Sequence, residues 1–183
     1  HTLRFLAAHR EKLPGQRFAI NLAPSTVCRV QFPLEVSRLL THYAIEPWQL
    51  IFEVTECSTF CNAEQALHIL RQLQKMGVRI AIDDFGTGYA SYARLKSVDA
   101  DILKIDGDFI RNIVNNSLDY QIVASICHLA RMKKMLVVAE YVETEEIRSA
   151  VHALGIDYVQ GYLIGKPVAL ESLAETEAST ADA

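Results

Sequence analysis

The sequence predicts a parallel α/β fold, because short apolar segments alternate along it with longer amphipathic ones. Six runs rich in Val, Ile and Phe are expected to be strands: residues 18–23, 50–56, 79–85, 102–106, 136–142 and 158–163. They lack clean polar alternation over most of their length, which is typical of parallel strands that are covered on both faces. Strand followed by helix, repeated along the chain, indicates a parallel sheet.

The segments between the strands carry apolar residues at helical spacing. The clearest are residues 63–77, 118–134 and 145–155, of which the first and third end on glycine, a residue that often follows a helix. Residues 1–15 are expected to form an amphipathic helix rather than a signal peptide, because no cleavage-like segment follows them.

An open doubly wound sheet and a closed barrel both fit this alternation. No G-x-G-x-x-G motif follows an early strand, which weakens a dinucleotide-binding interpretation. A complete barrel needs eight strand-helix units and about 250 residues, whereas this chain of 183 residues has six expected strands. About two units are therefore expected to be missing at the N-terminal end. Residues 1–172 are expected to form the barrel, and 173–183 a flexible polar tail.

The composition is that of a soluble globular domain. Half of the residues are apolar, 22% are charged, and the net charge is −4, so a general attraction to nucleic acid or to anionic lipid is not expected. No apolar run approaches the length of a membrane helix, which needs about 18 consecutive apolar residues. The four cysteines form no C-x-x-C pair, which favours reduced thiols and a cytoplasmic location over a disulfide or a zinc site.

Each expected strand carries polar residues that an apolar strand should avoid. Buried charges are costly unless they are paired or bound to a metal, and the carboxyl ends of barrel strands converge on one face, where active sites lie. The sequence therefore predicts a site at these strand ends. Its candidate residues are Asn21, Glu53, Glu56, Asp83, Asp84, Lys104, Glu140 and Gln160.

The residue types at these positions indicate a site for hard divalent cations. Carboxylate and amide oxygens suit Mg²⁺, Mn²⁺ or Ca²⁺. The adjacent Asp83 and Asp84 could serve two ions, the arrangement that enzymes use to cleave phosphodiesters. Lys104 adds a positive charge that can orient water or phosphate. The alternative is that the same residues form a buried network of ion pairs with a structural role.

A glycine-containing loop, DDFGTGYAS at residues 83–91, follows the third expected strand directly. Gly86 and Gly88, with Thr87 between them, would let the backbone approach a ligand closely. The loop's place after the aspartate pair favours an active-site loop over a plain surface turn.

These motifs resemble those of the EAL phosphodiesterase family. INLAP, FEVTE, IDDFGTGYAS, LKID, VAEYVET and YVQGYLIGKP occur in the order of that family and extend from residue 15 to 167. The resemblance implies a TIM-type (β/α) barrel, incomplete at the N-terminus. It also implies hydrolysis of cyclic di-GMP to linear pGpG with two Mg²⁺ or Mn²⁺ ions, and inhibition by Ca²⁺.

The resemblance also implies four metal ligands within this sequence. Asn21, Glu53 and Asp83 would bind the first ion, and Asp83 together with Asp84 would bind the second.

The remaining roles that the resemblance implies concern catalysis and support of the substrate. Lys104 would hold the attacking water, and Glu140 would act as general base or bind metal through water. Glu56 would anchor the loop of Gly86, Thr87 and Gly88, which is expected to support the substrate site and to couple metal occupancy to dimerisation. Gln160 and Glu143 would support the site, Glu143 through contact with guanine or with neighbouring residues.

The sequence departs from the family pattern at three places. The Glu-Ala-Leu signature is absent, and its Glu is a metal ligand in the family, so the 183-residue chain by itself is expected to be poorly active. Tyr141 replaces the usual small residue, and the loop reads GYAS where GYSS is common. Neither substitution removes a ligand.

Three functions remain open on this basis. The first is a cyclic-guanylate-specific phosphodiesterase, expected to be a homodimer that is regulated by upstream sensory or GGDEF domains. The second is a catalytically silent receptor that binds cyclic di-GMP and signals through a partner. The third is an enolase-like barrel in which a lysine abstracts a proton beside metal-bound carboxylates.

Overall fold

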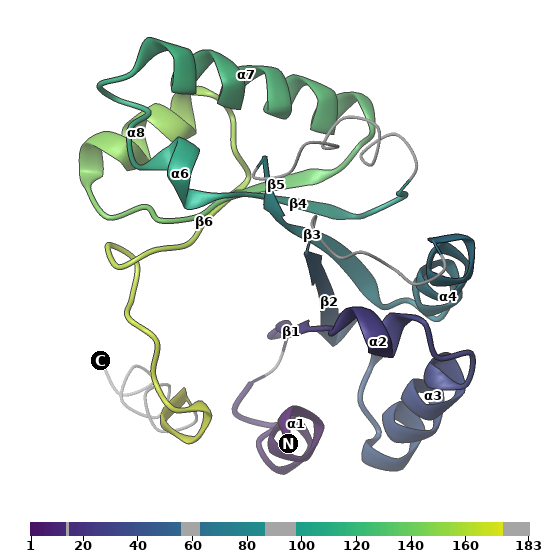
Figure 1. Cartoon of the computed structure of the whole chain (residues 1–183). Coiled ribbons are helices and arrows are strands. Elements are labelled where there is room, and N and C mark those ends of the chain that lie inside the picture. The colour runs from purple at the N-terminus through teal and green to yellow at the C-terminus, as the bar shows by residue number, and fades with distance from the viewer. Residues whose placement is uncertain (14, 56–62, 87–97, 174–183) are drawn as a thin grey trace. The chain divides into compact units, whose positions relative to one another are not determined.

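All six expected strands are present in the computed structural model, which describes residues 1–13, 15–55, 63–86 and 98–173. They follow one another in chain order within a single sheet. The strands are β1 (Phe18–Asn21), β2 (Leu50–Thr55), β3 (Arg79–Phe85), β4 (Ile102–Ile105), β5 (Leu136–Ala139) and β6 (Tyr158–Val159). The chain divides into two compact units, and each has its own helices (Figure 1).

The first unit comprises His1–Phe52, Phe60–Arg79 and Pro167–Ala183. The N-terminal helix is shorter than expected: α1 spans Thr2–Ala8, and Gly15 has a φ of +82°, outside the helical range. Phe5 and Leu13 are buried here, and Phe18 and Leu170 pack against them. The short elements of this unit are α2 (Pro24–Val27) and the 3-10 turns η1 (Pro47–Gln49) and η2 (Leu170–Ser172).

Two longer helices, α3 (Phe32–Tyr43) and α4 (Ala63–Lys75), belong to the same unit. The sequence pattern did not single out α3, which has a proline in its first turn and ends at Ala44, a left-handed residue with a φ of +48°. The end of α4 is as expected: Gly77 has a φ of +98°. Val78 then donates its N–H to the carbonyl of Leu73, which closes the last turn.

The second unit comprises Glu53–Thr59 and Ile80–Lys166 and holds the parallel strands β3 to β6. Its helices are α6 (Gly107–Ile110), α7 (Ser117–Met132) and α8 (Glu145–Ala153). Figure 1 shows α7 and α8 together on one side of β4, β5 and β6. All four residues of β4 are buried, and the inner face of α7 buries Val123, Ile126 and Ala130. For β4, this confirms the expected parallel strand with both faces covered.

The last two strands end earlier than the sequence suggested. β5 stops at Ala139, because Tyr141 has a φ of +59° and cannot continue the strand. β6 has two residues and gives way to a turn in which Ile164 donates to the carbonyl of Gly161. A Cβ at position 161 would lie 2.3 Å from the carbonyl oxygen of Val142, so this close approach of two backbones requires glycine.

Among the described residues, we find no helix with the combined length and apolar character that a membrane span demands.

Candidate active site

An irregularity in the pairing of β3 with β4 sets the position of the two aspartates. Ile82 pairs with Leu103 and Phe85 pairs with Ile105, so that Asp83 and Asp84 together lie opposite Lys104. This is the count of a β-bulge, which changes the direction of the side chains on the bulged strand. Asp84 has a φ of +54°, a left-handed conformation that aspartate tolerates better than most residues.

Lys104 lies at the centre of a buried cluster of acidic side chains. Its Nζ lies 2.7 Å from Oδ1 of Asp83, 2.7 Å from Oε1 of Glu140 and 3.2 Å from Oε1 of Glu53. The cluster brings together three strands and the residue after a fourth, since Glu53 is on β2, Asp83 on β3 and Lys104 on β4, and Glu140 directly follows β5. The strand-end placement that the sequence predicted is thus observed for these four residues.

The contacts of Lys104 fix its charge. Burial alone would lower the pKa of the ammonium group, but hydrogen bonds to Asp83 and Glu140 outweigh burial and raise the pKa above its usual value. Lys104 therefore stays protonated and acts as a hydrogen-bond donor at neutral pH. A neutral lysine base, which the enolase-like interpretation requires, does not fit these surroundings.

Two of the carboxyl groups are harder to ionise than usual. Burial raises the pKa of Glu140, and the hydrogen bond from Lys104 partly opposes that effect. Burial also raises the pKa of Asp84, and the nearby charges of Asp83 and Asp106 raise it further. Four carboxyl groups thus surround one ammonium group, and repulsion among the carboxylates remains when all of them are ionised.

The acidic cluster has the donor set of a cation site. Carboxylate oxygens of Asp83, Asp84 and Glu140 lie within 4.8 Å of one another. These oxygens are hard ligands, which bind Mg²⁺, Mn²⁺ or Ca²⁺ rather than soft metals. A divalent cation would also relieve the repulsion among these carboxylates, which adds to the effect of burial on the pKa of Asp84 and of Glu140.

The supporting residues that the sequence predicted are less buried than the cluster. Gln160 is exposed, and its backbone joins two segments: its N–H donates to Ala139, and its carbonyl accepts from Val142. Glu143 is exposed. Gly86 follows β3, and a Cβ there would lie 2.4 Å from the ring of Phe109.

The remaining predicted site residues are not part of the described cluster. Asn21 is the last residue of β1 and belongs to the first unit, so its part in metal binding stays a prediction. Glu56, Thr87 and Gly88 lie outside the described residues.

The sequence marked Tyr141 as unusual for the family but did not show which residues it contacts. This residue follows Glu140, and its ring lies against Gly107, the first residue of α6, and Arg111, the residue that follows α6. The only signal in the sequence was indirect: a bulky residue stands at position 141, and a glycine follows the LKID motif at position 107.

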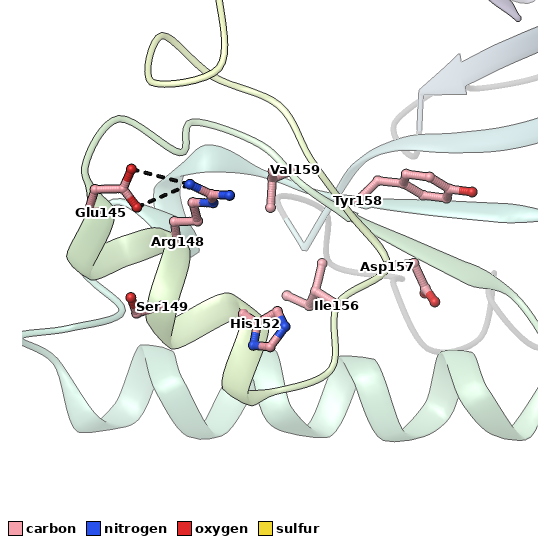
Figure 2. Close-up of a pocket in the computed structure, with 8 residues that line it drawn as sticks. All are labelled: Glu145, Arg148, Ser149, His152, Ile156, Asp157, Tyr158 and Val159. Carbon is pink, nitrogen blue, oxygen red and sulfur yellow. Dashed lines mark hydrogen bonds and ion pairs between the residues drawn. The ribbon is translucent and has the colours of Figure 1, made fainter.

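A separate pocket of about 470 Å³ lies between α8 and β6 (Figure 2). Its polar groups are partly engaged within the protein. Arg148 pairs with Glu145 on the same helix, and the carboxylate of Asp157 accepts the N–H of Val137 at 2.8 Å. None of the clustered acids lines this pocket, so we do not assign it to the same site.

Comparison with known proteins identifies the family. The family model described as the EAL domain matches residues 1–167.

The chain belongs to the EAL family.

Named relatives and a solved structure agree with this assignment. The EAL chain is 70% identical over 178 residues to the cyclic di-GMP phosphodiesterase PdeF of Escherichia coli K12, an alignment that covers 97% of this chain and 24% of PdeF. It is 50% identical over 165 residues to the probable cyclic di-GMP phosphodiesterase PdeA of the same organism, covering 90% of this chain and 23% of that protein. The chain thus spans about a quarter of the length of these relatives.

The structural match supports the fold class as well. The PaMucR phosphodiesterase, solved as a c-di-GMP complex, superposes with a TM-score of 0.84 at 38% identity, covering 93% of this chain and 70% of that one. The parallel α/β chain is therefore a part of a TIM-type barrel, as the sequence predicted. EAL phosphodiesterases depend on metal, and the acidic cluster around Lys104 provides the ligand chemistry that this dependence requires.

Proposed function

We propose that this chain is the catalytic part of a phosphodiesterase that hydrolyses cyclic di-GMP to linear pGpG. The observation that carries the proposal is the cluster itself: Lys104 Nζ is within 3.2 Å of three carboxylates that come from β2, β3 and the end of β5. The names of the relatives support the substrate, since PdeF is called a cyclic di-GMP phosphodiesterase and PaMucR was solved with c-di-GMP.

The metal ligands in this proposal are Glu53, Asp83 and Asp84, with Asn21 from β1. Glu140, whose carboxylate is grouped with those of Asp83 and Asp84, would also bind an ion through a water. Two Mg²⁺ or Mn²⁺ ions bound there would lower the pKa of a bound water and stabilise the leaving oxygen. Asp83 and Asp84 are suited to serve neighbouring ions, because the bulge places both of them opposite Lys104. Calcium, which prefers more ligands and a looser geometry, is proposed to bind without supporting turnover.

The protein's own groups then direct the attack on the phosphodiester. The protonated ammonium of Lys104 donates hydrogen bonds and orients the attacking water. Glu140 accepts the proton of that water at a carboxylate oxygen, and burial, which raises its pKa, makes it a stronger base than an exposed glutamate. Glu56, Gly86, Thr87, Gly88, Gln160 and Glu143 are proposed to support the substrate side of the site.

The direct test is product analysis with the full-length protein that contains this sequence. Cyclic di-GMP is incubated with the protein in Mn²⁺, in Mg²⁺ and in Ca²⁺, and the nucleotides are separated by chromatography. We expect pGpG in the first two and none in the third. Nothing in the comparisons or in the described residues favours the silent receptor, but tight binding of cyclic di-GMP without any pGpG would establish it and refute the proposal.

The wider setting of the domain is proposed from the length of its relatives. Because the chain spans about a quarter of its named relatives, we propose that sensory or GGDEF domains accompany it in the whole protein and that the catalytic unit works as a cytoplasmic homodimer. Size measurement of the full-length protein by light scattering, with and without Mn²⁺, tests the dimer.

A further inference from the structure

The turn at residues 140–142 is held on two sides by backbone hydrogen bonds. Glu140 donates its N–H to the carbonyl of Ile105 at the end of β4 at 3.3 Å. Val142 donates its N–H to the carbonyl of Gln160 at 3.0 Å. Tyr141 lies between these two anchors with a φ of +59°, a conformation that is costly for a bulky residue and persists only where the surroundings enforce it.

The ring of Tyr141 packs on the first turn of α6. A Cβ at Gly107 would lie 2.7 Å from Cδ2, 2.8 Å from Cβ and 2.9 Å from Cγ of Tyr141, so the ring lies against the backbone of that glycine. The guanidinium carbon of Arg111 is 3.7 Å from the ring centroid, within the range of a cation–π contact. The same arginine also pairs with Asp108 at 3.5 Å.

These contacts join the segments that carry two site residues. Gly107 is three positions after Lys104, and Tyr141 is the residue after Glu140. The ring therefore connects the turn beside Glu140 to the helix that begins just beyond Lys104. The two functional groups so linked, Nζ of Lys104 and Oε1 of Glu140, lie 2.7 Å apart.

We infer that Tyr141 is a positioning residue, whose ring, seated on Gly107 and Arg111, holds the Glu140 carboxylate against the Lys104 ammonium. The inference rests on the proposed function, because Glu140 is the proton acceptor there. A proton acceptor that is displaced by about 1 Å loses much of its rate contribution. The ring provides the contact, so the phenol hydroxyl is not required.

The contact between position 107 and position 141 gives a reciprocal test in the full-length protein. Gly107→Ala introduces the methyl group that collides with the ring. Tyr141→Gly removes the ring and accommodates the positive φ, and the double variant combines both changes. Tyr141→Phe keeps the ring and removes only the hydroxyl. Gly165→Ala is the matched control, since a Cβ there meets nothing within 4 Å.

The expected result is a loss of turnover that depends on the ring. Gly107→Ala and Tyr141→Gly each lower kcat by about tenfold or more, with KM for cyclic di-GMP changed by less than about threefold. Tyr141→Phe and Gly165→Ala keep kcat within about twofold of the parent, as expected when the contact is retained. The double variant is no slower than Tyr141→Gly alone, because the alanine methyl then has no ring to displace.

Two results would overturn the inference. Additive losses in the double variant would show that Gly107→Ala acts through the fold, which melting temperatures of the same variants would also reveal. A rise in KM at constant kcat for Tyr141→Gly would show that the ring contacts cyclic di-GMP instead of positioning Glu140.

Manganese binding separates this inference from the proposed function. Mn²⁺ affinity is measured by electron paramagnetic resonance on the same variants without nucleotide. If the parent hydrolyses nothing, the proposed function fails, and the inference is then decided by these affinities. The inference is supported if Gly107→Ala weakens Mn²⁺ binding relative to the parent but has no such effect when it is added to Tyr141→Gly. Equal affinity in all variants overturns it.

Discussion

The ammonium nitrogen of Lys104 lies 2.7 Å from Oδ1 of Asp83, and both side chains are close to nine-tenths buried, at 8% and 12% exposure. An ion pair at this depth is sensitive to the loss of either partner, because the remaining charge stays desolvated. Here the cost in stability would differ between the two partners. Lys104 faces three carboxylates, so removing it leaves more charge unbalanced than removing any one acid.

Lys104→Ala is therefore expected to destabilise the metal-free protein strongly. Breaking a buried pair by removing one partner typically costs about 3–5 kcal/mol, and here Glu53, Asp83 and Glu140 all lose their counterion. Mn²⁺ should recover most of the loss, because it supplies positive charge at the same carboxylates. Melting temperatures with Mn²⁺ and with chelator measure both effects.

Lys166→Ala serves as the control, since Lys166 is exposed and contacts only the ring of Tyr162 among the interactions described for it. An equal, metal-independent loss in both variants would contradict the assignment of Lys104 to the cation site.

Asp83→Asn is expected to abolish hydrolysis. Asp83 is buried, pairs with Lys104 and lies close to Asp84 and Glu140, and it is the residue proposed to serve both metal ions. The amide keeps the shape of the side chain and removes its charge, so the loss reflects the missing charge rather than packing. The measurement is pGpG formation per minute at saturating Mn²⁺.

Asp99→Asn is the matched control, because the Asp99 carboxylate is 70% exposed and lies 3.8 Å from Lys133. Turnover of Asp83→Asn within about tenfold of the parent, a smaller effect than most single catalytic groups have, would refute the two-metal assignment.

Glu140→Gln is expected to lower kcat and leave substrate binding nearly intact. A general base contributes about 10²–10⁴-fold to rate, and its removal affects the transition state more than the bound substrate. Affinity for cyclic di-GMP is measured in Ca²⁺, which is proposed to bind without supporting turnover, and should change by less than about fivefold if Glu140 acts on water alone. The exposed Glu145→Gln variant is the control. A large loss of affinity in Glu140→Gln would reassign this residue to substrate binding.

The strands were predictable because each has a run of apolar residues that both faces of a parallel sheet require. Their lengths were not, since tertiary contacts end them. Tyr141 terminates β5 through a left-handed backbone, and Gly161 terminates β6 where two backbones meet closely. The helix α3 was not recognised from the sequence although its buried residues Val36 and Leu40 have helical spacing.

The candidate site was predictable in its residue types and not in its geometry. A carboxylate or lysine at the end of an apolar strand is visible in the sequence because burial of such a group is costly. The bulge that places Asp83 and Asp84 opposite Lys104 depends on how β3 pairs with β4. The register of that pairing cannot be predicted from the sequence of either strand alone. The same holds for Tyr141 and Gly107, which are 34 positions apart in the chain.

The pH dependence of metal binding follows from the raised pKa values of Asp84 and Glu140. A carboxyl group whose pKa is higher in the folded state holds its proton more tightly there than in the unfolded chain. Its contribution to stability is complete below the pKa of the unfolded state, near 4, and is lost as the pH rises through the higher folded value. The metal-free cluster therefore contributes less to stability at neutral pH than at acidic pH. Cation binding requires the same groups to be ionised.

The stabilisation by Mn²⁺ is therefore expected to grow between pH 5 and pH 7.5. At a hundredfold excess over the dissociation constant, a ligand adds about 2.7 kcal/mol, which corresponds to about 5–10 °C for a domain of this size. The full shift should appear at pH 7.5 and only a small part of it at pH 5. Asp84→Asn, which keeps the left-handed backbone, should melt at or above the parent temperature without metal at pH 7.5, because it removes a repelled charge. It should also lose most of the Mn²⁺ shift. An equal Mn²⁺ shift at both pH values, or an unchanged shift in Asp84→Asn, would show that these carboxylates do not bind the metal.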